Sequence, residues 1–124
     1  MNEQCSIKVT LTFVDPQLDS EAKDQQVRNL MRELKEIDEV DEVHCVEDPN
    51  PPSGNKSFVS FLIGVLSAEV SLENAEKLFN VLGDRLRNKP IKIKVESQGR
   101  SLEVEAYSVQ ELNSAINSAK SFLE

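Results

Sequence analysis

The stretch that most constrains this chain is Phe58–Leu66, a nearly uninterrupted apolar run that spells Phe-Val-Ser-Phe-Leu-Ile-Gly-Val-Leu. Such a run must be buried, but its periodicity alone does not separate a helix from a strand that is covered on both faces. Its large side chains recur at i, i+3, i+4, i+7 and i+8, and Ser57 stands where a helix cap would stand. We therefore predict a central buried helix that joins two half-domains, with a buried strand as the alternative interpretation.

The residues before this run are typical of one β-α-β unit. Cys5–Phe13 alternates apolar and polar residues, which predicts a strand with one solvated face. A helix of about four turns follows, with Asp19 or Ser20 as its cap, and Val40–Val46 is a weaker second strand. We expect the two strands to be parallel and joined by a right-handed crossover. Residues 47–57, rich in proline, form a loop.

A β-hairpin is the clearest local signal in the second half. Ile91–Val95 and Leu102–Ala106 both alternate, and Gln98 and Gly99 stand between them at the two corners of a turn. This register pairs opposite charges across the polar face of the hairpin. The predicted pairs are Lys94 with Glu103 and Lys92 with Glu105.

Two helices flank the hairpin in this interpretation. Ser71 would cap a helix that ends near Arg87, and Ser108-Val-Gln-Glu111 is a capping box that would open the last helix. The whole chain, residues 1–124, then forms a single domain of the α+β class with the order β-α-β-α-α-β-β-α. We expect a four-stranded mixed sheet with helices on one face. If residues 58–66 form a strand, the sheet gains a fifth member and approaches a ferredoxin-like arrangement.

The net charge of −8 is concentrated in the first half, where residues 1–48 hold 13 acidic and 5 basic side chains. A phosphate-backbone binder needs a clustered basic face, so we expect no nucleic-acid partner. We expect no signal peptide, because Met1–Lys8 is polar and no apolar h-region follows, and the sequence has no apolar run long enough to span a membrane. Two cysteines, Cys5 and Cys45, make no disulfide framework, which favours a reducing cytoplasm.

One candidate binding loop precedes the apolar run. Gly54, Asn55, Lys56 and Ser57 could hold an anion at a helix start. The Walker pattern needs a glycine directly before the lysine, whereas Asn55 stands there. An ordinary loop is the simpler interpretation, and a small-ligand or nucleotide sensor is the functional alternative.

A second candidate is an acidic surface between the first helix and the second strand. Its members are Glu36, Asp38, Glu39, Asp41 and Glu42. They lack the residue order of a calcium loop, so a solvated helix end or a contact with a basic protein partner is the expected role.

No catalytic set, cofactor site or metal site is evident in the sequence, so we predict that the chain is not an enzyme. His44 and Cys45 are adjacent in a predicted strand, so their side chains point to opposite faces and cannot act as a pair. Polar strand residues would line an open sheet face that is either wet or used for homo-oligomer formation. These residues are Lys8, Thr10, Thr12, Lys92, Lys94, Glu103 and Glu105.

Three segments resemble a small bacterial family called the effector-associated constant component. They are Pro51-Pro-Ser-Gly-Asn-Lys56, Ile63-Gly-Val-Leu66 and Gln98-Gly-Arg-Ser-Leu-Glu-Val104. The family tends to have Pro-Pro-Gly-x-Lys-Gly in the first segment, and Ser57 replaces its second glycine. Family members look like short proteins encoded beside caspase-like or trypsin-like peptidases and nucleotide-driven signalling proteins in conflict systems. The resemblance implies an adaptor or regulatory component that meets a larger effector and has no activity of its own.

Overall fold

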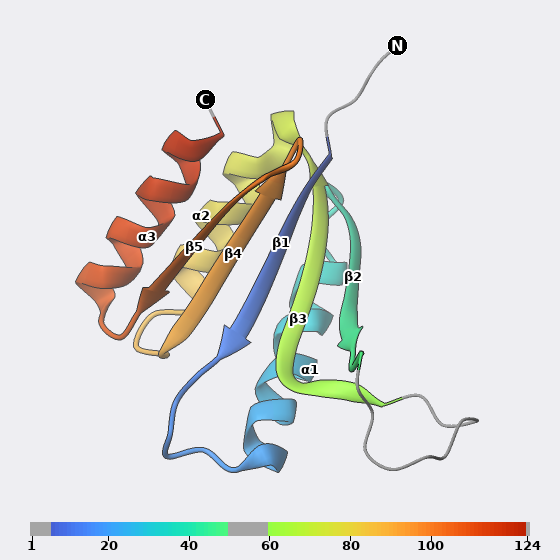
Figure 1. Ribbon diagram of the computed structural model, residues 1–124, viewed down its shortest axis with the longest axis vertical. Helices are drawn as coiled ribbons and strands as arrows, with labels where there is room; N and C mark the ends of the chain where they lie inside the picture. The colour runs from blue at the N-terminus through green and yellow to red at the C-terminus, as the bar shows by residue number, and fades with distance from the viewer. Residues whose placement is uncertain (1–5, 50–59, 124) are drawn as a thin grey trace.

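The computed structural model describes residues 6–49 and 60–123, which form one antiparallel sheet of five strands with three α-helices (Figure 1). The predicted α+β class is confirmed. The elements in chain order are β1 (Ser6–Phe13), α1 (Ser20–Lys35), β2 (Val40–Glu47), β3 (Phe61–Ser71), the short 3₁₀ turn η1 (Leu72–Asn74), α2 (Ala75–Arg85), β4 (Ile91–Ser97), β5 (Arg100–Ala106) and α3 (Val109–Phe122).

The helix predicted over the apolar run is wrong wherever the run is described. Residues from Phe61 onward form β3, and Phe58 lies outside the described residues. The side chains of Leu66, Ala68 and Val70 belong to the core, and their spacing of two is the spacing of one strand face. The sheet has five strands rather than four because this segment is a strand, which is the alternative that the sequence left open. The expectation that the whole run is buried is wrong, because Phe61, Leu62 and Ile63 at the start of β3 are exposed.

β3 also changes the relation between the strands of the predicted β-α-β unit. It pairs antiparallel with both β1 and β2, so these two strands point the same way without being neighbours in the sheet. The strand order is β2-β3-β1-β4-β5, and the sheet is antiparallel rather than mixed. The succession from β1 to β4 is the β-α-β-β-α-β of the ferredoxin-like arrangement, with β5 and α3 added after it.

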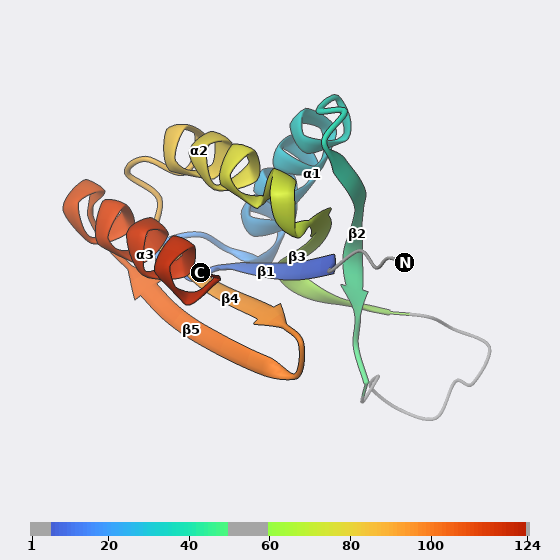
Figure 2. The ribbon, with the colours of Figure 1, turned by 90° about the horizontal axis from the view of Figure 1, so that it is seen from above.

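All three helices lie on one face of the sheet, as predicted, and leave the other face open (Figure 2). The core fills the space between the helices and the sheet, and it is aliphatic apart from two phenylalanines. Its largest fully buried side chains are Phe79, Ile7, Leu11, Leu34, Leu66, Leu78, Leu82, Leu86, Ile91, Ile93 and Leu112.

Of the four predicted helix caps, two are confirmed, and a third, Ser57, lies outside the described residues. The Oδ1 atom of Asp19 accepts a hydrogen bond of 2.8 Å from the backbone N–H of Ala22 at the start of α1. The Oγ atom of Ser108 accepts one of 3.1 Å from the N–H of Glu111 at the start of α3. Ser71 makes no such bond, because η1 intervenes before α2 begins.

The β4–β5 hairpin has the predicted register. Lys94 lies opposite Glu103, and Lys92 lies opposite Glu105. Gln98 and Gly99 have φ angles of 53° and 79°, and two successive positive values are the signature of a type I′ turn.

Candidate functional site

The five predicted acidic residues lie together at one corner of the molecule, which we call the acidic corner (Glu36, Asp38, Glu39, Asp41 and Glu42). A tight reversal brings them there. The N–H of Glu36 donates to the carbonyl of Glu33 at 3.2 Å as α1 ends, and the N–H of Val40 donates to the carbonyl of Ile37 at 3.1 Å as β2 begins. Ile37 is half-buried against the core, whereas four of the five carboxylates are exposed.

The position of the acidic corner opposes helix electrostatics. The carboxyl end of a helix carries partial negative charge, so carboxylates there cost stability rather than adding it. Basic residues of the last turn, Arg32 and Lys35, partly offset this repulsion. Helix electrostatics therefore give no stabilising role to the carboxylates next to the end of α1.

In the structure Glu69 lies next to the acidic corner and extends its negative surface, which the sequence interpretation missed. β2 pairs with β3 so that Glu42 lies opposite Glu69, and like charges directly opposite one another are unfavourable. The Nδ1 atom of His44 lies 3.9 Å from the Oε1 atom of Glu42, and both side chains are about half exposed or more. The alternation of Ser67, Glu69 and Ser71 with apolar residues was the signal available in the sequence.

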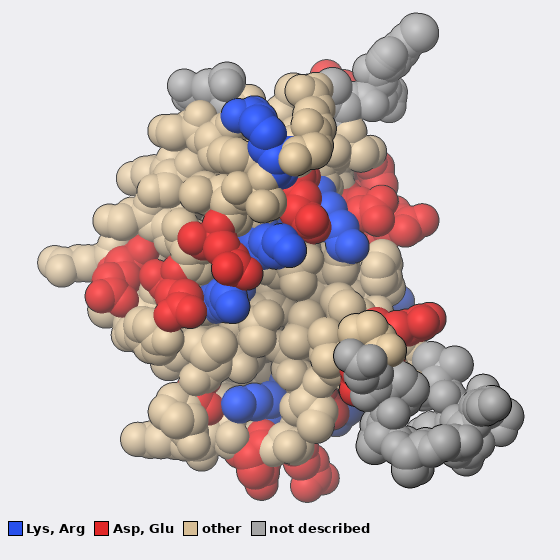
Figure 3. Space-filling model, viewed as in Figure 1, with Lys and Arg blue, Asp and Glu red and all other residues tan. Residues whose placement is uncertain are grey.

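The open sheet face carries charge in bands, as Figure 3 shows in the same view as Figure 1. Most of the basic side chains occupy the middle of this face, with some acidic atoms between them, and further acidic side chains gather on either side. The bands follow the strand order, with lysines on β1 and β4 and glutamates on the strands outside them, except that Glu96 on β4 lies among the lysines, opposite Lys8. The residues are Lys8, Lys92 and Lys94 in the middle, Glu42 and Glu69 on one side, and Glu103 and Glu105 on the other.

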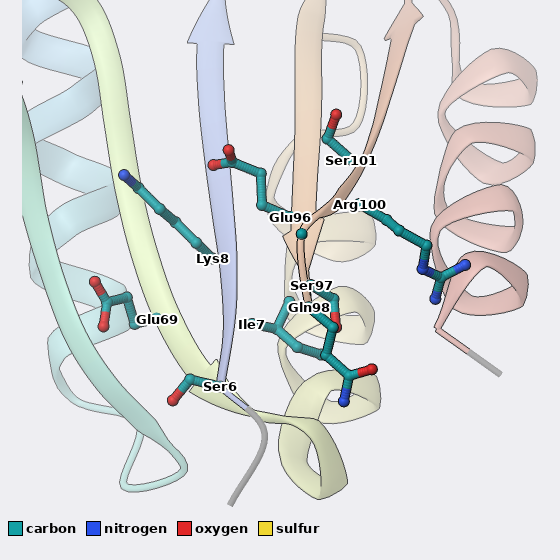
Figure 4. Close-up of a pocket in the computed structure, with 10 residues that line it drawn as sticks. Ser6, Ile7, Lys8, Glu69, Glu96, Ser97, Gln98, Arg100 and Ser101 are labelled. Carbon is teal, nitrogen blue, oxygen red and sulfur yellow. The ribbon is translucent and has the colours of Figure 1, made fainter.

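A hollow lies at one end of the open face, where β1, β3 and the β4–β5 turn meet (Figure 4). Lys8 is flanked across the sheet by Glu69 and Glu96, so the positive charge has carboxylates on both sides. Arg100 points away toward α3, where its guanidinium lies 4.8 Å from the centre of the Phe122 ring. The hollow is lined by serines but not by His44, so no serine there has a histidine base beside it.

His44 and Cys45 point to opposite faces, as predicted. Cys45 lies opposite Leu66 and packs against the core, whereas His44 lies opposite Ser67 on the open face. Within residues 6–49 and 60–123, no three histidine, cysteine, aspartate or glutamate side chains are grouped as metal ligands.

The predicted anion loop, Gly54, Asn55, Lys56 and Ser57, lies outside the described residues, and so does Cys5.

The described parts of the family-like segments have structural roles. Gly64 has a φ angle of 72°, and its N–H donates to Asp24 Oδ1 at 3.2 Å, which ties β3 to α1. Gly99 forms the hairpin turn.

Tyr107, just after β5, has a perturbed pKa. Its hydroxyl donates a hydrogen bond of 2.9 Å to Glu105 Oε1, and this bond is the main cause that raises the pKa of Tyr107. Slight desolvation and the negative charges of Glu105 and Glu111 act in the same direction. The backbone N–H of Tyr107 donates to Glu111 Oε1 at 2.6 Å, so both glutamates are fixed beside the end of β5.

None of the helices in the described part of the chain combines the length and apolar character needed to cross a bilayer.

Comparison of the chain with protein-family models, with curated proteins and with solved structures gave no match.

Proposed function

We propose that this chain is a non-enzymatic adaptor or regulatory component that binds a larger effector protein through the acidic corner. The observation that carries the proposal is that exposed carboxylates converge at the end of α1, where they oppose the helix dipole. A charge arrangement that does not stabilise its helix is a candidate for recognition. Its partner would present lysine and arginine side chains.

Electrostatic complementarity of this kind acts first on the rate of encounter. A concentrated negative patch attracts a basic partner over distances of about a Debye length, roughly 8 Å at physiological salt. The bound complex then gains from those charge pairs that lose water at the interface. Binding through the acidic corner should therefore weaken steeply as salt concentration rises.

The resemblance to the effector-associated constant component supports the class of partner. It implies a caspase-like or trypsin-like peptidase, or a nucleotide-driven signalling protein, encoded nearby in a bacterial conflict system. In that role the chain would hold or regulate the effector rather than catalyse a reaction.

The test is capture of candidate effectors by the purified protein, followed by measurement of the dissociation constant. The variant Asp38→Lys with Asp41→Lys reverses two charges of the acidic corner. The matched control, Glu73→Lys with Asp84→Lys, makes the same change in net charge at exposed positions on η1 and α2.

We expect the first pair of substitutions to weaken binding at least tenfold, because a close interfacial charge pair contributes about 1.5 kcal/mol or more. The control pair should leave affinity within about threefold, since screened charges outside an interface contribute little. Equal effects of the two pairs would rule out the acidic corner as the contact surface. If none of the effector proteins encoded nearby binds the chain under native salt, the adaptor role itself is overturned.

A further inference from the structure

The sheet has two edge strands, and they differ in regularity. β5 is hydrogen-bonded only to β4 in the described part of the chain, and its register is continuous over all seven residues from Arg100 to Ala106. β2, at the other edge, has register shifts between Val40 and Glu42 and between Cys45 and Glu47. Such irregularities make an edge a poor template for a further strand, whereas a regular edge is a good one.

The hairpin geometry decides which backbone groups of β5 point outward. In a two-residue hairpin the pair that closes the turn, here Ser97 and Arg100, shares both hydrogen bonds, and bonded pairs then alternate along the ladder. The N–H and C=O groups of Leu102 and Val104 consequently face β4. Those of Ser101, Glu103 and Glu105 face away from the sheet.

A shallow groove runs beside this edge, between β5 and α3, which lies next to β5 in Figure 1. Val104 on β5 is only half-buried and forms part of the groove. The helix side is formed by short side chains, Ser114, Ala115 and Ser118, which leave room above the strand. The charged residues that line the groove are Glu105 and Glu111, and both are acidic.

We propose that β5 accepts an extended segment of a partner protein as a sixth strand, and that this segment carries Lys or Arg at alternate positions with an aliphatic residue between them. The basic residues lie opposite Glu103 and Glu105 on the open face, and the aliphatic residue lies opposite Val104 over the groove. Backbone hydrogen bonds to Ser101, Glu103 and Glu105 hold the segment, which is the general mode of strand addition.

β4, the inner neighbour of β5, shows which side-chain pattern pairs with this strand. β4 places Lys92, Ile93 and Lys94 opposite Glu105, Val104 and Glu103 in turn. The Nζ atom of Lys92 lies 3.5 Å from Glu103 Oε2, so Glu103 already binds a lysine from one side. The proposed segment repeats this basic–aliphatic–basic pattern on the outer side.

A second copy of the chain fits this edge poorly. Antiparallel pairing of two β5 strands about Glu103 places that glutamate opposite itself, and pairing about Val104 places Glu103 opposite Glu105. Like charges directly opposite one another are destabilising. In these two registers the glutamates oppose a second copy and favour a basic segment of a different protein, which is the occupant that we propose.

This site lies at the sheet edge opposite β2 and the acidic corner, and it does not depend on the adaptor role proposed above. The two surfaces can be tested separately. The probe here is a labelled peptide, Ser-Ile-Lys-Ile-Lys-Val-Ser, and its control is Ser-Ile-Ile-Lys-Lys-Val-Ser, which has the same composition and charge without the alternation.

We expect the alternating peptide to bind about tenfold more tightly than its control by fluorescence anisotropy, because only the alternating order sets both lysines opposite the two glutamates. The substitutions Glu103→Lys and Glu105→Lys together should abolish this preference, whereas Asp38→Lys with Asp41→Lys should keep it. Equal binding of both peptides, or no binding at millimolar concentration, overturns the proposal.

Hydrogen exchange on the wild-type protein gives a second readout that needs no variant. Bound peptide should slow amide exchange at Ser101, Glu103 and Glu105, while Leu102 and Val104, already bonded to β4, serve as internal references. Ser101→Pro removes one outward N–H without removing a bond to β4, and it should weaken the peptide several-fold more than Ser101→Ala does. Unchanged exchange at the three amides contradicts strand addition.

Discussion

Gly64 is expected to be the position at which a single added methyl group costs this protein the most among its described glycines. It has a φ angle of 72°, which L-residues adopt at a cost of about 1–2 kcal/mol. A Cβ atom there would also lie 3.3 Å from the Cβ atom of Lys23 on α1. That atom is next to the helix backbone and cannot move away without moving the helix, so the crowding adds about 1 kcal/mol or more.

Two other glycines allow the cost of backbone strain to be separated from the cost of crowding. Gly99 has a φ angle of 79°, but a methyl group added there would meet no atom within 4 Å, so Gly99→Ala measures backbone strain without crowding. Gly83 lies inside α2 with no positive φ, and the nearest neighbour of an added methyl group would be Ile116 at 4.0 Å. Gly83→Ala should therefore stabilise the protein by about 0.5–1 kcal/mol through helix propensity.

The expected order of stability is Gly83→Ala above wild type, Gly99→Ala lower by about 1 kcal/mol, and Gly64→Ala lower by about 2–4 kcal/mol. Urea and thermal unfolding followed by far-ultraviolet circular dichroism measure it, since the chain has no tryptophan. For a domain of this size, each 1 kcal/mol corresponds to roughly 4 °C in Tm. A Gly64→Ala variant no less stable than Gly99→Ala would refute the reasoning, because it would mean that α1 does not constrain β3 at this point.

Two further predictions concern ionisation and ligand binding. Absorbance titration of Tyr107, the one tyrosine of the chain, should give a pKa above the ordinary 10.0, and Glu105→Gln should lower it toward that value. Because the pKa of Tyr107 is raised in the folded state, the hydroxyl–carboxylate bond contributes to folding stability at neutral pH, and this contribution is lost as pH rises through the raised pKa. A wild-type pKa of Tyr107 at or below 10.0 would contradict the bond. If the Gly54–Ser57 loop senses an anion, phosphate-bearing ligands should raise Tm in wild type and not in Lys56→Ala, and equal shifts in both would exclude that loop.

The features predicted correctly from the sequence are those decided by neighbouring residues. The hairpin register follows from Gln98 and Gly99 together with the alternation beside them, and the caps at Asp19 and Ser108 each need only three residues of context. The acidic corner was likewise visible, because all of its members lie close together along the chain.

The features that were missed depend on partners distant in sequence. Phe58–Leu66 fits helical spacing, and only the insertion of β3 between β1 and β2 decides in favour of a strand. Glu69 joins the acidic surface through the pairing of β3 with β2, and the local alternation around Glu69 does not show which strand lies beside it. The groove beside β5 requires both the strand order and the packing of α3.

The central place of β1 has a consequence for how the chain folds. Among the described strands β1 is synthesised first, yet its two neighbours are β3 and β4, and the pair of Lys8 with Glu96 joins residues separated by most of the described chain. Pairings of such high contact order slow folding, because a long loop must close before they form. The β4–β5 hairpin, by contrast, can form as soon as it is synthesised. β1 therefore remains without its β4 neighbour until most of the chain has been synthesised. A chain interrupted after α2 would leave one edge of β1 unpaired and prone to aggregation.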